Sequence, residues 1–311
     1  MIVALIPSFN SGTFLRGSVL SLLQQTKIPD RIIVIDDAST DESINTIIDL
    51  EKSGKIEIHK NPINLGKAES LNHAFNNINA DYFILQDADD ISLPQRIDKQ
   101  VAFMESDKNL GCSCSFIQYI NKQGSSIGKG MLDLNSEDKL KDYLAGDEPF
   151  GLLCPSAIIR STVVKDSNLQ FRGRFWPADD IDLWNRIAEA GWLVLAQPEV
   201  LVQYRIHGNS AVSSNFIRSR MQFEWVRACL RERRKGRPEP DHEEFMKSWN
   251  SISLIHRMNR SRKIISKGMY RSGGFAVAER KYLSAFMLLS SAIILAPKYS
   301  ISRLIQQISK N

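Results

Sequence analysis

The chain has 311 residues, of which 43% are hydrophobic and 24% charged, and this composition excludes a disordered, collagen-like or multi-pass membrane protein. Residues 1–215 carry 20 Lys and Arg against 28 Asp and Glu, a net charge of −8, whereas residues 216–311 carry 20 against 7, a net charge of +13. The asymmetry predicts two modules with different partners, residues 1–215 and residues 216–311.

The cysteines and the N-terminal residues indicate the cellular compartment of the protein. Four cysteines are too few and too scattered for a disulfide framework, so we expect buried free thiols and a reducing compartment. The opening segment, MIVALIPSFN, lacks a basic region and has only a short apolar run, which favours a first strand over a signal peptide. The expected location is the cytoplasm, at the inner face of the cell membrane if the basic module binds there.

Short apolar runs alternate with amphipathic segments through the first ninety residues. Strands are expected at 2–6, 31–35, 56–59 and 82–85, and helices at 14–23, from 41 onward and at 66–75. This alternation predicts a mainly parallel sheet with helices on both faces. Ligands of such sheets bind beyond the carboxyl ends of the strands. Two of the four strands end in acidic clusters, so we expect both clusters at the same edge of the sheet.

After residue 90 the strands and helices alternate less regularly, and the expected elements near the end of the chain are all helices. Further elements are expected as helices at 95–105, 136–145 and 179–190 and as strands at 112–120, 156–159, 193–196 and 200–206. From residue 216 the expected helices are 216–235, 241–266, 274–296 and 299–309, with a linker at 233–240.

Acidic residues follow two of the expected strands. Asp87 and Asp89 are two residues apart, so on extended chain their carboxylates project to one side, as a hard divalent cation requires. Asp36 and Asp37 end another strand. The alternatives are an acidic turn for the first pair and a helix cap for the second, although a cap near Asp41 does not explain two adjacent carboxylates at a strand end.

Six motifs in order resemble the family 2 glycosyltransferases over residues 1–210. The matching segments are 6–10 (IPSFN), 34–41 (VIDDASTD), 64–72 (NLGKAESLN), 86–90 (QDADD), 178–184 (ADDIDLW) and 204–207 (YRIH). Asp179 stands where the fifth motif usually has Glu. Residues 216–311 lie outside the resemblance.

The resemblance implies an α/β fold of the GT-A type, a Rossmann-like sandwich with a mainly parallel central sheet, to which the last hundred residues add a C-terminal helical extension. It implies a metal-dependent, inverting transfer from a nucleotide-diphosphate sugar, with a UDP-sugar as the expected donor. The expected acceptor is a saccharide or a lipid-linked molecule. Because members of this family commonly act in bacterial surface polysaccharide or glycolipid assembly, the resemblance implies the same role here.

The resemblance also implies roles for individual residues in donor binding. Asp89 and His207 are the implied ligands of Mn²⁺ or Mg²⁺, which would neutralise the charge on the leaving diphosphate. Asp87 would orient the ribose or the water shell of the metal. The residues that would contact the nucleotide are Pro7, Phe9, Asp36, Asp37 and Lys67.

Asp180 is the implied general base. An inverting displacement needs a carboxylate on the acceptor side of the sugar to remove the hydroxyl proton. The alternative is that Asp179, Asp180 and Asp182 only complement the first turn of a helix. Trp176, a few residues earlier, either stacks on the face of a sugar ring or is a core residue.

The basic module holds an apolar run at 283–296 (LSAFMLLSSAIILA), which at 14 residues is too short to span a bilayer comfortably. It is either a buried helix of a helical hairpin or a helix lying in the membrane plane. The positive charge around it predicts an anionic membrane surface as a further partner. Nucleic acid is not expected, because aromatic residues do not interleave with the basic ones.

Two other functions compete with glycosyl transfer. A nucleotidyltransferase predicts a Gly-rich basic phosphate loop after the first strand, and residues 7–17 lack that density of Gly, Lys and Arg. A non-catalytic adaptor on a transferase fold, binding membrane or nucleic acid, predicts decay of the metal and base motifs, and both are intact.

Overall fold

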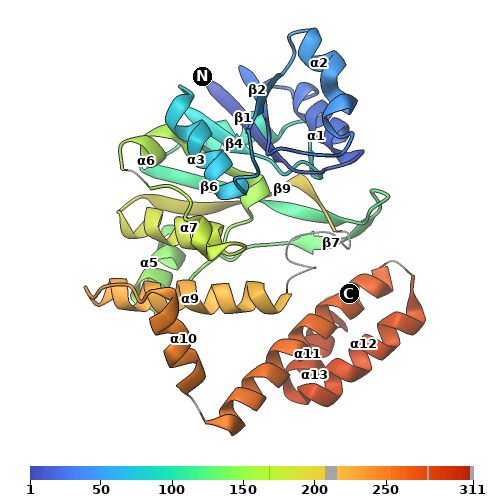
Figure 1. Cartoon of the computed structure of the whole chain (residues 1–311), viewed down its shortest axis with the longest axis vertical. Coiled ribbons are helices and arrows are strands. Elements are labelled where there is room, and N and C mark those ends of the chain that lie inside the picture. Colours follow the sequence, from blue (N-terminus) through green and yellow to red (C-terminus); the bar gives the residue numbers. More distant parts are fainter. Residues whose placement is uncertain (168, 207–215, 252, 279, 309–311) are drawn as a thin grey trace. The chain divides into compact units, whose positions relative to one another are not determined.

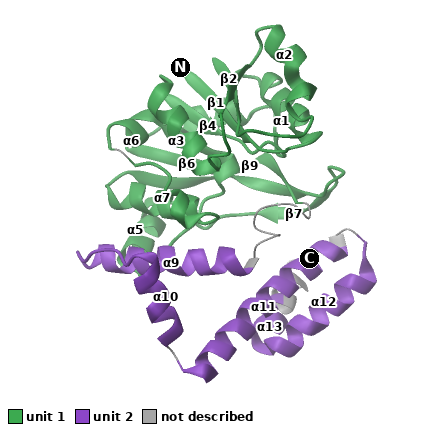
Figure 2. Ribbon diagram, viewed as in Figure 1, with its two compact units in different colours: residues 1–206 green, residues 207–311 purple. Residues whose placement is uncertain are grey.

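The computed structural model describes residues 1–311 apart from 168, 207–215, 252, 279 and 309–311. The chain divides into two compact units, residues 1–206 and 207–311 (Figure 2). Since residues 207–215 are not described, the module boundary expected after residue 215 stays a prediction. Within the described part of the chain, no helix is both long and apolar enough to cross a membrane.

The first unit is built on one nine-stranded sheet (Figure 1). The strands are β1 (Ile2–Ser8), β2 (Arg31–Asp36), β3 (Glu57–Lys60), β4 (Tyr82–Leu85), β5 (Ile91–Ser92), β6 (Leu110–Ile120), β7 (Ser126–Gly130), β8 (Ala157–Arg160) and β9 (Leu193–Arg205). Their order across the sheet is β3-β2-β1-β4-β8-β6-β9-β5, with β7 beside β6.

Strand direction changes along this sheet. β3, β2, β1 and β4 are all parallel. β8 is antiparallel to both of its neighbours, and β6 and β9 are parallel to each other. β5 pairs antiparallel with β9, and β7 pairs antiparallel with β6. The parallel half matters for function, because it brings the carboxyl ends of β1, β2 and β4 to one edge.

Helices cover both faces of the sheet. They are α1 (Phe14–Leu23), η1 (Ile44–Ile47), α2 (Ile48–Lys52), α3 (Lys67–Asn77), α4 (Arg96–Glu105), α5 (Glu137–Ala145), η2 (Cys154–Ser156), α6 (Ser161–Lys165), η3 (Gly173–Phe175) and α7 (Asp179–Glu189). Alternate residues of β1 enter two separate cores: Val3 and Leu5 pack with α3, α6 and α7, whereas Ala4 and Ile6 pack with α1 and α4. The expected α/β sandwich is thus confirmed.

The two closing strands expected at 193–196 and 200–206 form the single strand β9. Pro198 lies between the two expected strands, and proline has no N–H to donate to a strand ladder. The strand continues past it because the pairing with β6 shifts there, from Ser115 opposite Gln197 to Phe116 opposite Val200. The proline and Glu199 lie in the resulting bulge, where no ladder hydrogen bond is needed.

The second unit is helical. Its helices are α9 (Phe216–Arg234), α10 (His242–Ser251), α11 (Leu254–Ala278), α12 (Tyr282–Leu295) and α13 (Pro297–Ile308). The helix expected at 241–266 is two helices, α10 and α11. α11 continues to Ala278, so the helix expected at 274–296 is divided between the end of α11 and α12. A Cβ at Gly273 would lie 2.7 Å from the Leu289 side chain, so this glycine allows close packing of α12 on α11.

Candidate active site

Loops that follow the parallel strands β1, β2 and β4 lie at one edge of the sheet. The loop after β1 is fastened to the loop after β2, because the Asn10 side chain accepts a hydrogen bond of 2.8 Å from the Thr40 amide. Pro7 is partly buried near the end of β1, and Phe9 just beyond it is 50% exposed. An aromatic surface is therefore available beside the loop that carries Asp36 and Asp37.

Asp36 and Asp37 are both buried and hydrogen bonded within the protein. Asp36 accepts from the Ser39 amide at 3.0 Å, which closes the turn after β2. Asp37 accepts from the amides of Leu65 and Gly66, each at 2.8 Å. The Asp37 carboxylate thus holds the loop that leads into α3. Contact of either residue with a nucleotide stays a prediction.

Three carboxylates gather after β4. Single oxygens of Asp87, Asp89 and Asp90 lie within 4.8 Å of one another. The Lys67 ammonium, from the first turn of α3, pairs with Asp87. Burial disfavours the charge of Lys67, but the adjacent Asp87 outweighs it and raises the pKa of Lys67 well above its usual value. The Lys67 cation therefore lies beside an acidic cluster of three carboxylates.

Asp90 is the buried member of this acidic cluster, with no exposed surface. Its Oδ1 accepts a hydrogen bond of 2.7 Å from the Arg205 amide, and the Arg205 guanidinium donates to the Asp89 carbonyl at 2.9 Å. Its Oδ2 is buried and has no hydrogen-bond partner among the described residues. Burial, and then the charges of Asp89 and Asp87, raise the pKa of Asp90 well above its usual value.

This donor set suits a hard divalent cation. A buried oxygen without a partner and two nearby carboxylates supply the ligands that Mg²⁺ and Mn²⁺ prefer, and binding a cation would satisfy that oxygen. Asp89, the ligand expected from the sequence, belongs to the cluster. The other expected ligand, His207, lies outside the described residues.

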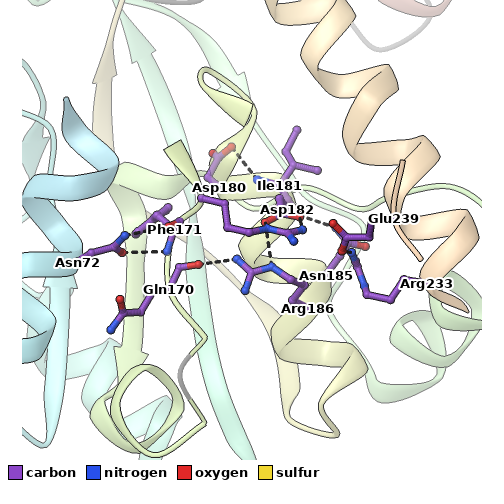
Figure 3. Close-up of polar contacts among 11 residues, drawn as sticks. Asn72, Gln170, Phe171, Asp180, Ile181, Asp182, Asn185, Arg186, Arg233 and Glu239 are labelled. Carbon is purple, nitrogen blue, oxygen red and sulfur yellow. Dashed lines mark hydrogen bonds and ion pairs between the residues drawn. The ribbon is translucent and has the colours of Figure 1, made fainter. Parts of the chain in front are cut away.

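The three carboxylates at the start of α7 have different surroundings. Asp182 is fully buried and accepts hydrogen bonds from the guanidinium groups of Arg172 and Arg186 (Figure 3). Asp180 is half-buried and accepts a hydrogen bond of 2.8 Å from the Ile181 amide. Burial, and then the charge of Asp179, raises the pKa of Asp180 to about 7, although Lys67 opposes the shift.

The segment before α7 is fastened to α3. The Asn72 side chain donates to the Phe171 carbonyl at 2.8 Å and accepts from the Phe171 amide at 2.9 Å (Figure 3). The Arg172–Asp182 ion pair then ties the start of this segment to the first turn of α7. The Trp176–Pro177 peptide bond within it is cis. Because the charges of Lys67 and Asp87 also act on the pKa of Asp180, the acidic cluster and the start of α7 are electrostatically connected.

Sequence reasoning missed Arg96. It is fully buried in α4 and donates to the Leu85 carbonyl at 2.8 Å, the Ser92 hydroxyl at 3.0 Å and the Gln100 side chain at 2.9 Å. Burial lowers the pKa of Arg96 to about 9, and Asp90 opposes that shift. The guanidinium therefore supplies positive charge behind the acidic cluster. Its only signal in the sequence is the four-residue spacing from Gln100.

Comparison with known proteins identifies the family. Residues 3–166 match the family model described as glycosyl transferase family 2. The chain belongs to this family. The expected enzyme class, a glycosyltransferase, is thereby confirmed.

Relatives of this family 2 member span most of its length. An uncharacterized glycosyltransferase of Haemophilus influenzae is 27% identical over 284 residues, covering 87% of this chain and 84% of its own. The amylovoran biosynthesis glycosyltransferase AmsE of Erwinia amylovora is 27% identical over 220 residues, covering 68% and 79%.

Solved structures confirm the fold of this family 2 chain. TarS of S. aureus in complex with UDP-GlcNAc has a TM-score of 0.58 at 12% identity, covering 97% of this chain and 92% of that one. The mannosyltransferase PcManGT of Pyrobaculum calidifontis, in complex with GDP-Man and Mn²⁺, has a TM-score of 0.56 at 15% identity, covering 99% and 79%. The expected GT-A type architecture with C-terminal helices is thus confirmed.

Proposed function

We propose that the protein is a metal-dependent, inverting glycosyltransferase that moves a sugar from a nucleotide-diphosphate sugar to a hydroxyl acceptor. The observation that carries the proposal is the acidic cluster of Asp87, Asp89 and Asp90. It contains a buried oxygen without a partner, and its charge reaches the half-buried carboxylate of Asp180. In this proposal the cluster would be the cation site, and Asp180 would be the base.

The acidic cluster would hold Mn²⁺ or Mg²⁺ through Asp89 and Asp90, with Asp87 turned to the water shell or the ribose and His207 as a further ligand. A divalent ion bound there supplies charge neutralisation for the leaving diphosphate. Lys67 pairs with Asp87 in the protein alone. Once a divalent ion is bound beside Asp87, the Lys67 ammonium would bind a phosphate oxygen.

The nucleotide would lie against the loops after β1 and β2. Phe9 offers an exposed ring, and Pro7 continues that apolar surface. Asp36 and Asp37 would bind the base and ribose. Asp37 also accepts hydrogen bonds from the amides of Leu65 and Gly66, which directly precede Lys67. A UDP-sugar is the proposed donor, in keeping with the UDP-GlcNAc complex of TarS.

Asp180 would remove the proton of the acceptor hydroxyl. With a pKa near 7, its carboxylate is partly ionised at neutral pH and basic enough to accept a proton as the oxygen attacks the anomeric carbon. The proposed acceptor is a saccharide or a lipid-linked molecule. The amylovoran biosynthesis relative supports a role in bacterial surface polysaccharide or glycolipid synthesis.

A panel of nucleotide sugars tests the proposal. Each donor is incubated with the full-length protein and Mn²⁺, and release of nucleotide by hydrolysis or transfer is measured with and without a chelator. We expect turnover of one donor class that excess chelator abolishes. Turnover that persists undiminished in chelator would contradict the metal dependence, and binding of no nucleotide sugar at all would contradict the donor class.

A further inference from the structure

Five large apolar side chains of α12 are exposed. Tyr282, Leu283, Phe286, Met287 and Ile294 are between 54% and 78% exposed. At about 100° per residue, these five positions fall within an arc of about 140° on the helix. We call these five residues the α12 apolar face. An exposed apolar surface that is contiguous marks a binding surface more often than isolated exposed residues do.

The inner side of α12 contains small residues together with Leu289, which packs against Gly273 of α11. Ala285, Ala292 and Ala296 are buried, and α12 packs against α11 and α13 (Figure 2). The hydroxyls of Ser266 on α11 and Ser300 on α13 both donate to the Ala292 carbonyl, at 2.8 and 3.0 Å.

Large apolar residues therefore lie on both sides of α12, whereas a helix in water exposes few of them. Helices that associate in lipid meet at small residues and hydroxyl hydrogen bonds, because burying large apolar side chains there gains nothing. The α12 apolar face therefore fits an apolar environment outside the protein.

The charge of the same helices identifies what that environment is. Residues 254–308 contain ten Lys and Arg and a single Asp or Glu. The basic residues Arg280, Lys281 and Lys298, which flank α12 on both sides, are all exposed. A second copy of the chain would bring two such positive surfaces together, which repel. Nucleic acid matches the charge but offers no large apolar surface to five such side chains.

We propose that the α12 apolar face lies in the surface of an anionic lipid bilayer. The 14 residues of α12 are about 21 Å long, shorter than the roughly 30 Å hydrocarbon core, so the helix would lie in the plane of the membrane. Its apolar side chains enter the acyl boundary while the flanking cations meet anionic headgroups. The proposal goes beyond glycosyl transfer and requires neither donor nor metal.

Co-sedimentation with vesicles tests the proposal. The full-length protein should bind phosphatidylglycerol vesicles at low salt at least about tenfold more strongly than phosphatidylcholine vesicles, and high salt should weaken this binding. The double variant Leu283→Gln/Ile294→Gln should lose at least about tenfold in binding. Its matched control is Ile28→Gln/Met131→Gln, which removes apolar residues that are 56% and 67% exposed in the first unit and should bind normally.

A site-specific probe tests the orientation of α12. All four native cysteines are buried, so a single introduced cysteine can be labelled with a polarity-sensitive dye. A label at Phe286→Cys should shift to the blue when vesicles are added. A label at Ser284→Cys, exposed but about 160° away around the helix, should shift much less.

Three results would overturn the proposal. One is failure of the parent protein to co-sediment with phosphatidylglycerol vesicles at low salt. Another is equal binding by the Leu283→Gln/Ile294→Gln variant, which would leave charge alone as the cause. The third is a dye shift at position 286 that follows protein concentration without lipid, which would make a second copy of the chain the partner. None of these results depends on whether the protein transfers sugar.

Discussion

At the scale of single residues, carboxylates close in sequence have separate tasks. Asp182 is neutralised by two guanidinium groups and is a structural residue. Asp180, two positions earlier, is half-buried and has a pKa raised to about 7, first by burial. Asp182 does not cap the helix, since its hydrogen-bond partners are the side chains of Arg172 and Arg186. Asp180 remains the proposed base.

Replacement of Asp180 by Asn retains the shape of the side chain but removes the proton acceptor. We expect Asp180→Asn to lower transfer about 10² to 10⁴-fold while nucleotide affinity changes little. The parent rate should rise with pH through about 7, as the carboxyl loses its proton, and the variant should lack this rise. Steady-state kinetics across pH measure both effects. Asp98→Asn, at an exposed carboxylate of α4, is the matched control and should retain the parent profile.

Thermal melting of the same variant separates a base from a structural carboxylate. The folded-state pKa of Asp180 lies above the usual value of 3.8, so the folded chain binds this proton more tightly than the unfolded chain. Its effect on stability is therefore most favourable at low pH and is lost as pH rises to about 7. Asp180→Asn should melt higher than the parent at pH 8. A lower melting temperature there, with full activity, would restore the helix-capping interpretation.

At the scale of elements, α3 links the nucleotide loops to the start of α7. Its first residue, Lys67, pairs with Asp87, and five residues later Asn72 is hydrogen bonded to both backbone groups of Phe171. A single helix thus sets the place of the proposed phosphate contact and of the segment that leads to Asp180.

Loss of the Asn72 hydrogen bonds should loosen that segment. We expect Asn72→Ala to lower kcat about 10- to 100-fold, with a smaller change in nucleotide affinity, because Asp180 loses its fixed position. The pH midpoint of the remaining activity should also move, which a purely structural role would not cause. Asn77→Ala, at an exposed Asn of the same helix that donates only locally to His73, is the control. Equal kcat in the two variants would contradict the positioning role.

Periodic elements could be predicted from the sequence, and long-range partners could not. Short continuous apolar runs predict β1, β2 and β4 and their common edge, because such runs are typical of parallel strands buried on both faces. The motif segments predict which carboxylates follow these strands. The ion pair of Asp182 with Arg172 joins residues ten apart, and the Arg96 network joins α4 to β4, with no local pattern for either. The α12 apolar face needed the helix packing, since the run 283–296 is apolar on every side.

At the scale of the whole molecule, the two units differ in charge and composition. The family 2 match, residues 3–166, falls within the acidic first unit. The basic second unit carries the α12 apolar face. We therefore propose a separate partner for each unit, a nucleotide sugar with a divalent cation for the first and an anionic lipid surface for the second.

We propose above all that the acidic cluster binds a divalent cation together with a nucleotide. Calorimetric titration of Mn²⁺ into the full-length protein with UDP present tests it most directly. We expect one Mn²⁺ site in the parent protein and in the Asp98→Ala control, and binding at least about tenfold weaker in Asp89→Ala. Mn²⁺ affinity that is unchanged in Asp89→Ala would contradict the claim.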